Sequence, residues 1–198
     1  MKSTLQYISV LFLIFGLTFN AKSEEGKLLD PVKWTQGLYK VNDSIYLLKF
    51  DATIEDHWHV YSHYIAEGGP VPTTITFEKK ENVVTVDTIQ EAGVLHEEHD
   101  PNFDMILRWY DNSVSFYQLI KPNGEKSSIK GYLEFMTCDD KQCLPPEYID
   151  FEYSLPGQAK EGNESIQALY KAALEGTAEL VAQAKDVKGV SVLAKEIE

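Results

Sequence analysis

Two cysteines, Cys138 and Cys143, are the residues whose type and spacing most directly suggest chemistry. They are the only cysteines of the 198-residue chain, and four polar residues separate them. Such a pair can form a structural disulfide, a redox-active thiol pair or part of a metal site. A structural zinc site needs about four ligands, so the two cysteines alone lack half of the usual set.

The surrounding sequence favours a redox pair over a structural disulfide. A disulfide that closes so short a loop restrains the unfolded chain only weakly, so stabilisation is a poor reason for it. The pair follows a predicted strand that ends at Met136, which places it at an accessible end of the fold. Pro145 and Pro146 fix their φ angles and stiffen the chain beyond the second cysteine. We therefore expect exchange through a mixed disulfide that the remaining cysteine resolves.

Charged neighbours should make the reduced pair a weak nucleophile. Asp139, Asp140 and Glu147 disfavour a nearby thiolate by charge repulsion, and Lys141 offsets this only in part. The alternative is a non-catalytic binding module in which the pair is a permanent structural disulfide, since oxidising compartments favour such bonds.

The first residues predict export. Lys2 precedes an apolar run that is too short to span a bilayer comfortably, and Asn20 and Ala21 follow it. We interpret residues 1–21 as a signal peptide and expect an exported protein. The formal net charge of −13 makes nucleic acid an unsuitable partner and suits basic partners.

Short β-branched and aromatic runs separated by turn residues predict strands between Tyr39 and Tyr153. The predicted strands are Ser44–Ala52, His57–Tyr64, Thr74–Lys79, Val83–Thr88, Met105–Tyr110, Ser113–Ile120, Ser128–Met136 and Tyr148–Ser154. This spacing predicts an all-β, immunoglobulin-like β-sandwich over residues 22–157. Residues 158–198 predict a helical tail, capped by Asn163, with an apolar face that continues to Leu180 and Val181 until Gly189 interrupts it.

The segment from Gly131 to Glu147 resembles the active-site segment of the N-terminal periplasmic domain of the thiol:disulfide interchange protein DsbD. Residues 56–61 and 93–103 resemble the aromatic strand and the cap loop of that domain. The resemblance implies a periplasmic protein of a Gram-negative bacterium, in which Cys143 forms the mixed disulfide with a partner and Cys138 resolves it. It also implies that Phe103 in the cap loop, which includes His96 and Glu97, shields the pair, and that Tyr61 and His59 shape the site.

Three departures from that family concern the site itself. His59 replaces a common tyrosine, residues 99–101 look like an insertion in the cap loop, and the turn between the cysteines is slightly shorter. The resemblance implies electrons arriving from a thioredoxin-like donor and passing to exported thioredoxin-fold acceptors, including cytochrome c maturation proteins, without a cofactor. Full-length members continue into a membrane domain and a thioredoxin-like domain, so we expect a separate membrane DsbD-type protein as donor, or recruitment to another task.

Two other site hypotheses come from the polar residues. Alternate residues of a strand share a face, so clustered histidines suggest a periplasmic metal-binding protein. The histidines are His57, His59, His63, His96 and His99. The acidic residues Glu97, Glu98 and Asp100 resemble paired carboxylates for glycoside hydrolysis, but nothing in the sequence fixes their separation.

Overall fold

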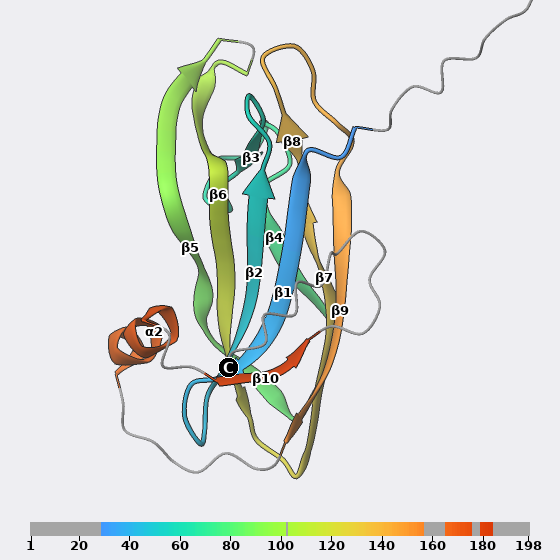
Figure 1. Cartoon of the computed structure of the whole chain (residues 1–198), viewed down its shortest axis with the longest axis vertical. Helices are drawn as coiled ribbons and strands as arrows, with labels where there is room; N and C mark the ends of the chain where they lie inside the picture. The colour runs from blue at the N-terminus through green and yellow to red at the C-terminus, as the bar shows by residue number, and fades with distance from the viewer. Residues whose placement is uncertain (1–28, 102, 157–164, 176–178, 184–198) are drawn as a thin grey trace, which may run out of the picture.

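The computed structural model describes residues 29–101, 103–156, 165–175 and 179–183, and it forms a sandwich of two antiparallel sheets (Figure 1). The larger sheet has the order β10 (Glu179–Gln183), β1 (Val32–Lys40), β2 (Tyr46–Ile54), β6 (Met105–Pro122), β3 (His59–Tyr61) and β8 (Thr137–Cys138), with β5 (Val83–Asp100) also paired with β6. The smaller sheet has the order β4 (Thr74–Glu81), β7 (Lys126–Phe135) and β9 (Glu147–Pro156). The all-β, immunoglobulin-like sandwich predicted from the sequence is confirmed.

Aromatic side chains from both sheets fill the space between them. Trp34 of β1 contacts Phe135 of β7, with ring centroids 5.0 Å apart, and Phe50 of β2 contacts Phe151 of β9 at 5.7 Å. Strand alternation explains this core, because every second residue of a strand points to the same face. Val60 of β3 belongs to the same buried cluster.

A close approach between β4 and β7 requires glycine at position 131. A Cβ atom there would lie 1.9 Å from the carbonyl oxygen of Thr76, and the pairing register of β4 shifts between Phe77 and Lys79. Only hydrogen fits in this space, so Gly131 sets the spacing of the smaller sheet.

The chain passes directly from one sheet to the other at Met136. Strand β7 ends at Phe135 in the smaller sheet, and β8 begins at Thr137 in the larger one. The pair Cys138 and Cys143 therefore lies at this crossing, at the end of the sandwich that carries β3 and β8 in Figure 1.

The predictions for the longest hairpin were wrong in extent. Strand β5 runs on to Asp100, and Met105–Pro122 is one strand where two were predicted. Register shifts between Val86 and Gln90 and between Gly93 and Leu95 interrupt the alternation, and residues with positive φ accompany them. At the first shift three residues of β5 lie opposite one of β6, and at the second three residues of β6 lie opposite one of β5, so the two long strands resembled separate short strands in the sequence. The predicted cap loop is thus mostly strand, and we call residues 93–101 and 103–110 the arm.

Two smaller predictions also need correction. Strand β1 was not predicted, and β3 is shorter than the predicted strand from His57 to Tyr64 because His57, at φ 69°, lies before it. His63 therefore follows the strand and does not continue its face.

The C-terminal region contains a helix and then a strand. Helix α2 (Ile166–Leu174) is capped by Ser165, whose Oγ accepts a hydrogen bond from the amide of Ala168 at 3.2 Å. Leu169 of the helix is buried against the larger sheet. The predicted continuation through Leu180 and Val181 is wrong, because Glu179–Gln183 pairs with the open edge of β1 as β10.

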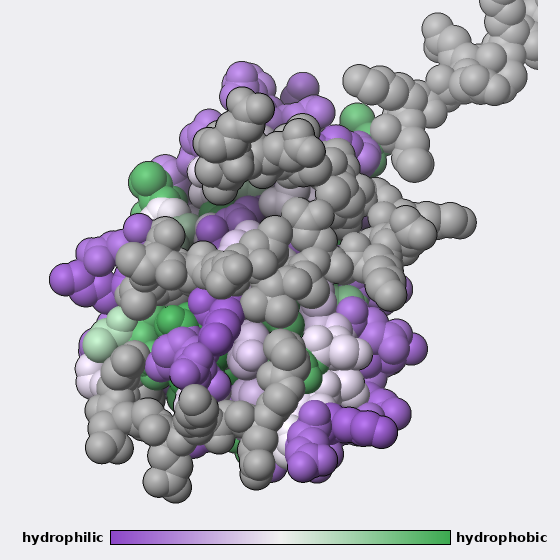
Figure 2. All heavy atoms as spheres, turned by 60° about the horizontal axis from the view of Figure 1, so that its bottom comes forward, coloured by the Kyte–Doolittle hydropathy of each residue, from purple (hydrophilic) through white to green (hydrophobic). Residues whose placement is uncertain are grey.

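Helix α2 and β10 lie toward the end of the sandwich opposite β3 and β8 (Figure 1). Figure 2, turned so that this end comes forward, shows mostly hydrophilic described residues around smaller apolar areas. Residues 1–21, Asn163 and Gly189 lie outside the described residues, so the signal peptide stays a prediction, whereas the helix cap expected at Asn163 is at Ser165. Within the described part of the chain, no helix has the length and apolarity needed to cross a bilayer.

Candidate redox site

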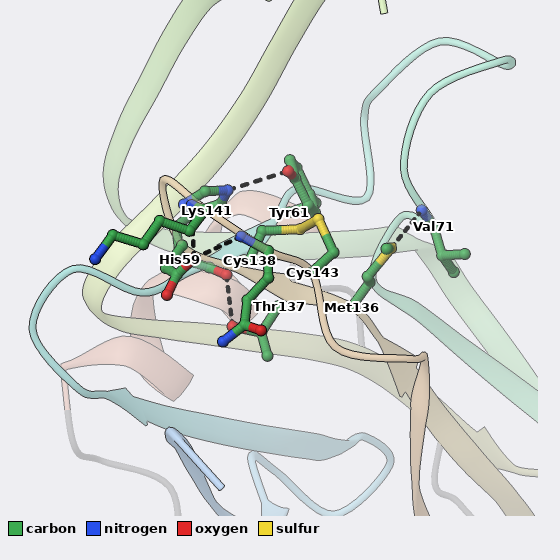
Figure 3. The surroundings of a disulfide bond; sticks show 10 residues. His59, Tyr61, Val71, Met136, Thr137, Cys138, Lys141 and Cys143 are labelled. Atoms are coloured by element: carbon green, nitrogen blue, oxygen red, sulfur yellow. Dashed lines mark hydrogen bonds between the residues drawn. A yellow bond between two sulfur atoms is a disulfide. The ribbon is translucent and has the colours of Figure 1, made fainter. Parts of the chain in front are cut away.

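The two predicted cysteines form a disulfide across a tight turn (Figure 3). Cys138 ends β8 and Cys143 faces it as an antiparallel bridge. The turn between them is closed by the amide of Asp139, which donates to the carbonyl oxygen of Gln142 at 2.9 Å. The Asp139 carboxylate accepts from the amides of Lys141 and Gln142, both at 2.7 Å. These hydrogen bonds hold the turn in one conformation and lower the pKa of Asp139. The charge of this carboxylate makes the turn acidic.

The two sulfur-bearing residues differ sharply in exposure. Cys138 is only 2% exposed and lies in a buried cluster with Tyr61 and Leu107, whereas Cys143 is exposed. Strand pairing buries the first cysteine, and the polar turn carries the second to the surface. An incoming group can therefore approach the disulfide from the side of Cys143.

A hollow of about 510 Å³ surrounds the disulfide. Its walls come from β3, from the arm and from the turn. The lining residues are His59, Tyr61, Asp100, Phe103, Leu107, Trp109, Cys138, Asp139, Asp140, Lys141, Gln142 and Cys143. The hollow has walls that are largely aromatic. Its opening, which we call the mouth, is acidic, because three of the four charged residues that line the hollow are aspartates.

Five residues besides the cysteines were predicted to belong to the site. The structure places three of them in the wall of the hollow and a fourth directly behind that wall. His59, Tyr61 and Phe103 line the hollow with the cysteines, and Phe103, at the tip of the arm, is 40% exposed. His96 lies behind this wall, where its ring stacks on Trp109 with centroids 5.8 Å apart.

Glu97 is the fifth predicted residue, and it does not line the hollow. Its carboxylate accepts a hydrogen bond from Nε of Arg108 on the neighbouring strand. Glu97 thus contributes to the pairing of β5 with β6, while Asp100, which was considered only for glycoside hydrolysis, is the acidic residue of the arm that lines the hollow.

His59 and Tyr61 form a bonded pair beside the disulfide. The Nε2 atom of His59 lies 3.1 Å from the hydroxyl oxygen of Tyr61, and the two rings meet edge to face (Figure 3). Burial lowers the pKa of His59, although Asp140 and Asp111 oppose this effect. Burial, helped by Asp100, raises the pKa of Tyr61 to about 12. The pair is therefore a neutral imidazole and a protonated phenol near neutral pH.

Polar contacts hold β3 at both ends. The hydroxyl of Thr137 donates to the carbonyl oxygen of His59 at 2.8 Å, and the hydroxyl of Thr73 donates to that of Tyr61 at 2.6 Å. Just after β3, the carboxylate of Glu91 accepts hydrogen bonds from Ser62 Oγ at 2.8 and 3.1 Å. Such contacts fix the orientation of the side chains that face the disulfide.

Leu107 and Trp109 are site residues that the sequence reasoning missed. Both lie on β6 two positions apart, so they share the face that lines the hollow. Met105, Leu107 and Trp109 are alternate residues, which predicts that they share one face of a strand. That this face lies beside the disulfide becomes clear only when the arm is recognised as a single hairpin.

The histidines occupy separate surroundings. In the described part of the chain, no three His, Cys, Asp or Glu side chains come together in a way that could hold a metal ion. His57 is exposed before β3, and the ring of His63 bonds to the carbonyl oxygen of Thr73. His96 and His99 lie near Asp111 and Asp104, with each Nε2 to carboxylate distance at 3.3 Å.

A family model matches the part of the chain that forms the sandwich and carries the two cysteines. The family model described as "Thiol:disulfide interchange protein DsbD, N-terminal" matches residues 32–155, more than half of the chain. A sequence comparison with curated proteins finds no match.

Two solved structures are similar to the chain. The reduced N-terminal domain of DsbD from Neisseria meningitidis is 18% identical, with a TM-score of 0.39 over 62% of this chain and 86% of that one. The N-terminal periplasmic domain of ScsB from Proteus mirabilis is 16% identical, with a TM-score of 0.46 over 74% of this chain and 54% of that one. On the family match, the chain belongs to the DsbD N-terminal family, whose domains serve thiol/disulfide interchange.

Proposed function

We propose that this protein relays electrons in the periplasm, with Cys143 as the cysteine that bonds to partners and Cys138 as the one that resolves the mixed disulfide. The observation that carries the proposal is the unequal exposure of the two residues, with Cys138 2% exposed and Cys143 exposed at the mouth of the hollow. A permanent structural disulfide has no need of this asymmetry, whereas an exchange site needs one accessible and one protected sulfur.

The reaction has two steps. In the reduced protein, the thiolate of Cys143 attacks a disulfide of the partner, forms a mixed disulfide and releases one partner thiolate, which takes up a proton. Cys138 then loses its proton and attacks the Cys143 sulfur, which forms the internal disulfide and releases the second partner thiol. Two electrons pass to the partner, and a thioredoxin-like donor restores the dithiol by the reverse sequence.

The acidic mouth keeps the reduced pair from reacting indiscriminately. Asp139, Asp140 and Asp100 line the hollow, and their charges disfavour a thiolate in it, with Lys141 as the opposing charge. A partner that brings a positive surface to the mouth removes this penalty. Reactivity thus depends on docking.

The expected partners are proteins. The arm beside the hollow exposes large apolar side chains, among them Val94 at 71%, Leu95 at 48% and Ile106 at 50%. Exposed apolar groups beside a reactive sulfur favour association with a protein surface. Exported thioredoxin-fold acceptors and a membrane DsbD-type donor fit this role.

The trapping experiment tests the proposal directly. Cys138→Ala, expressed in the native host, leaves Cys143 with no resolving thiol, so a covalent complex with the partner should accumulate and disappear on reduction. The matched control is Cys143→Ala, which keeps the buried thiol and should trap nothing. Recovery of no complex through Cys143, or equal recovery from both variants, would refute the relay.

The reduction potential separates exchange from a structural disulfide. Structural disulfides of exported proteins have potentials below about −300 mV, whereas exchange proteins lie above that value. We expect the pair to equilibrate with glutathione or thioredoxin-type buffers. A potential below about −300 mV would favour the permanent structural disulfide instead.

A further inference from the structure

The buried position of Cys138 raises the question of where its proton goes when the mixed disulfide is resolved. The residue is 2% exposed, so its thiol has little direct contact with solvent. The thiolate is the nucleophile in exchange, so a proton must leave before Cys138 can attack. A nearby base is therefore needed inside the hollow.

We propose that the imidazole of His59 is the general base that takes the proton from Cys138 during resolution and the general acid that returns it in the reverse step. This inference rests on the proposed function, because it concerns the second step of that exchange. It makes His59 a catalytic residue in addition to one that shapes the site.

Strand pairing places the two groups on one face. His59 of β3 is the direct antiparallel partner of Cys138 of β8. Directly opposite residues of such a pair have their Cβ atoms about 4.5–5.5 Å apart and point to the same side of the sheet. Both residues line the same hollow, and Figure 3 shows the imidazole beside Cys138.

Neighbouring rings hold the imidazole in this position. Tyr61 contacts it through the hydrogen bond at 3.1 Å and an edge-to-face ring contact at 5.0 Å, and Trp109 packs on it at 5.7 Å. The hydroxyl of Thr137 fixes the main chain of His59 from β8 itself. A base held by several contacts needs little reorganisation before it accepts a proton.

The charges around His59 make it better suited to this role than the carboxylates. Asp139 and Asp140 face it from the turn, Asp111 from β6 and Asp100 from β5, with Lys141 as the cation of the turn. Asp139 is a weak base, because hydrogen bonds from the turn lower its pKa.

Burial, which outweighs these charges, lowers the pKa of His59 and keeps the ring neutral and ready to accept a proton at pH 7. Once protonated, the ring is stabilised by the same four carboxylates. Tyr61, with a pKa of about 12, keeps its own proton throughout.

Resolution moves one proton and two electrons. The S–H bond of Cys138 breaks and its proton moves to the imidazole. The new thiolate attacks the Cys143 sulfur, so the Cys138–Cys143 bond forms and the bond from Cys143 to the partner sulfur breaks. The leaving thiolate takes the proton from the imidazolium. The dithiol of this protein is oxidised by two electrons and the partner disulfide is reduced by two.

An aromatic disulfide, 5,5′-dithiobis(2-nitrobenzoate), resolves the two steps. Mixed with one equivalent of fully reduced protein, it releases one coloured thiolate when Cys143 attacks and a second when Cys138 resolves. The second phase is unimolecular and independent of reagent concentration. We expect its rate to rise with pH through an inflection that reports His59.

His59→Asn should slow the second phase about tenfold or more at pH 7 and remove the inflection, because general base catalysis contributes at least that much. The first phase should change little. His99→Asn, an exposed histidine of the arm outside the hollow, is the matched control and should keep both phases. In His59→Ala, added imidazole should restore the second phase, which a purely structural role of His59 would not allow.

The outcomes separate the two proposals. If His59→Asn keeps the rate and the inflection of the second phase, the general-base role is overturned, while release of two equivalents still supports exchange. If the wild-type protein releases no second equivalent, the relay itself fails and the role of His59 fails with it. Loss of the second phase without rescue by imidazole in His59→Ala would also overturn the proton-transfer role.

Discussion

Glu91 is the residue whose loss should reveal how the base of the arm is attached to the strand that carries the site. One carboxylate oxygen, Oε1, accepts from the amide of His63 at 2.5 Å, and the other, Oε2, accepts from the hydroxyl of Tyr110 at 2.7 Å. Ser62 Oγ approaches both oxygens. One side chain of β5 thus holds the chain just beyond β3 and a residue of β6.

Replacing Glu91 with Gln keeps the size but removes the charge and one acceptor oxygen. Either the His63 amide or the Tyr110 hydroxyl must then face an NH₂ group. A hydrogen bond to a charged group contributes about 1.5–3 kcal/mol, so we expect a loss of about 2–4 kcal/mol in the free energy of unfolding. That is a large part of the roughly 5–15 kcal/mol that stabilises a typical domain.

Urea unfolding of the oxidised protein, followed by tryptophan fluorescence, measures this loss. With a slope of about 2 kcal/mol per molar, the midpoint should fall by about 1–2 M. Glu98→Gln removes an exposed charge of the same strand and should change stability by less than about 0.5 kcal/mol. In a double-mutant cycle with Tyr110→Phe, the two losses should not add. Equal midpoints for the Glu91 and Glu98 variants would refute the reasoning.

Three further predictions concern the sheet, the pH dependence and the charge of the mouth. Gly131→Ala should destabilise the domain by about 3 kcal/mol or more in the same urea assay, because its Cβ would overlap the carbonyl oxygen of Thr76; an unchanged midpoint would contradict the close approach. The pKa of Tyr61 is raised from 10.0 to about 12, so the folded state favours the protonated phenol. The stability that the protonated phenol contributes is therefore present below pH 10 and is lost between about pH 10 and 12. Tyr61→Phe should lose less stability than the wild type over that interval, and parallel pH profiles would contradict this. Because Asp100, Asp139 and Asp140 line the hollow, salt should slow the reaction of the reduced protein with cationic cystamine and speed its reaction with the anionic aromatic disulfide; equal salt slopes in stopped-flow measurements would exclude a field from these carboxylates.

The sequence was sufficient to predict the sandwich and the position of the cysteine pair. Regular alternation identified most strands, and the polar turn after Met136 identified an exposed site beside Cys143. Both signals are local, so a single sequence carries them.

The remaining features depend on pairing between distant segments. Register shifts before Gln90 and before Leu95 interrupt the pairing of β5 with β6, which hid the length of the arm and the places of Leu107 and Trp109 in the wall of the hollow. The segment Glu179–Gln183 suits a helix as well as a strand, and the open edge of β1 decides for the strand. The burial of Cys138 likewise depends on β3, which comes from a distant part of the chain.

The passage of the chain between the two sheets at Met136 has a consequence for recognition. Cys138 is fixed by hydrogen-bonded neighbours, while the turn that ends at Cys143 is held to it by the disulfide and by its own few hydrogen bonds. We therefore expect the opening of the disulfide to change the conformation only of the turn from Asp139 to Cys143 and to leave the sandwich unaltered. In the proposed function, a partner would distinguish the oxidised from the reduced protein by contacts with that short turn, and amide hydrogen exchange should differ between the two states there alone.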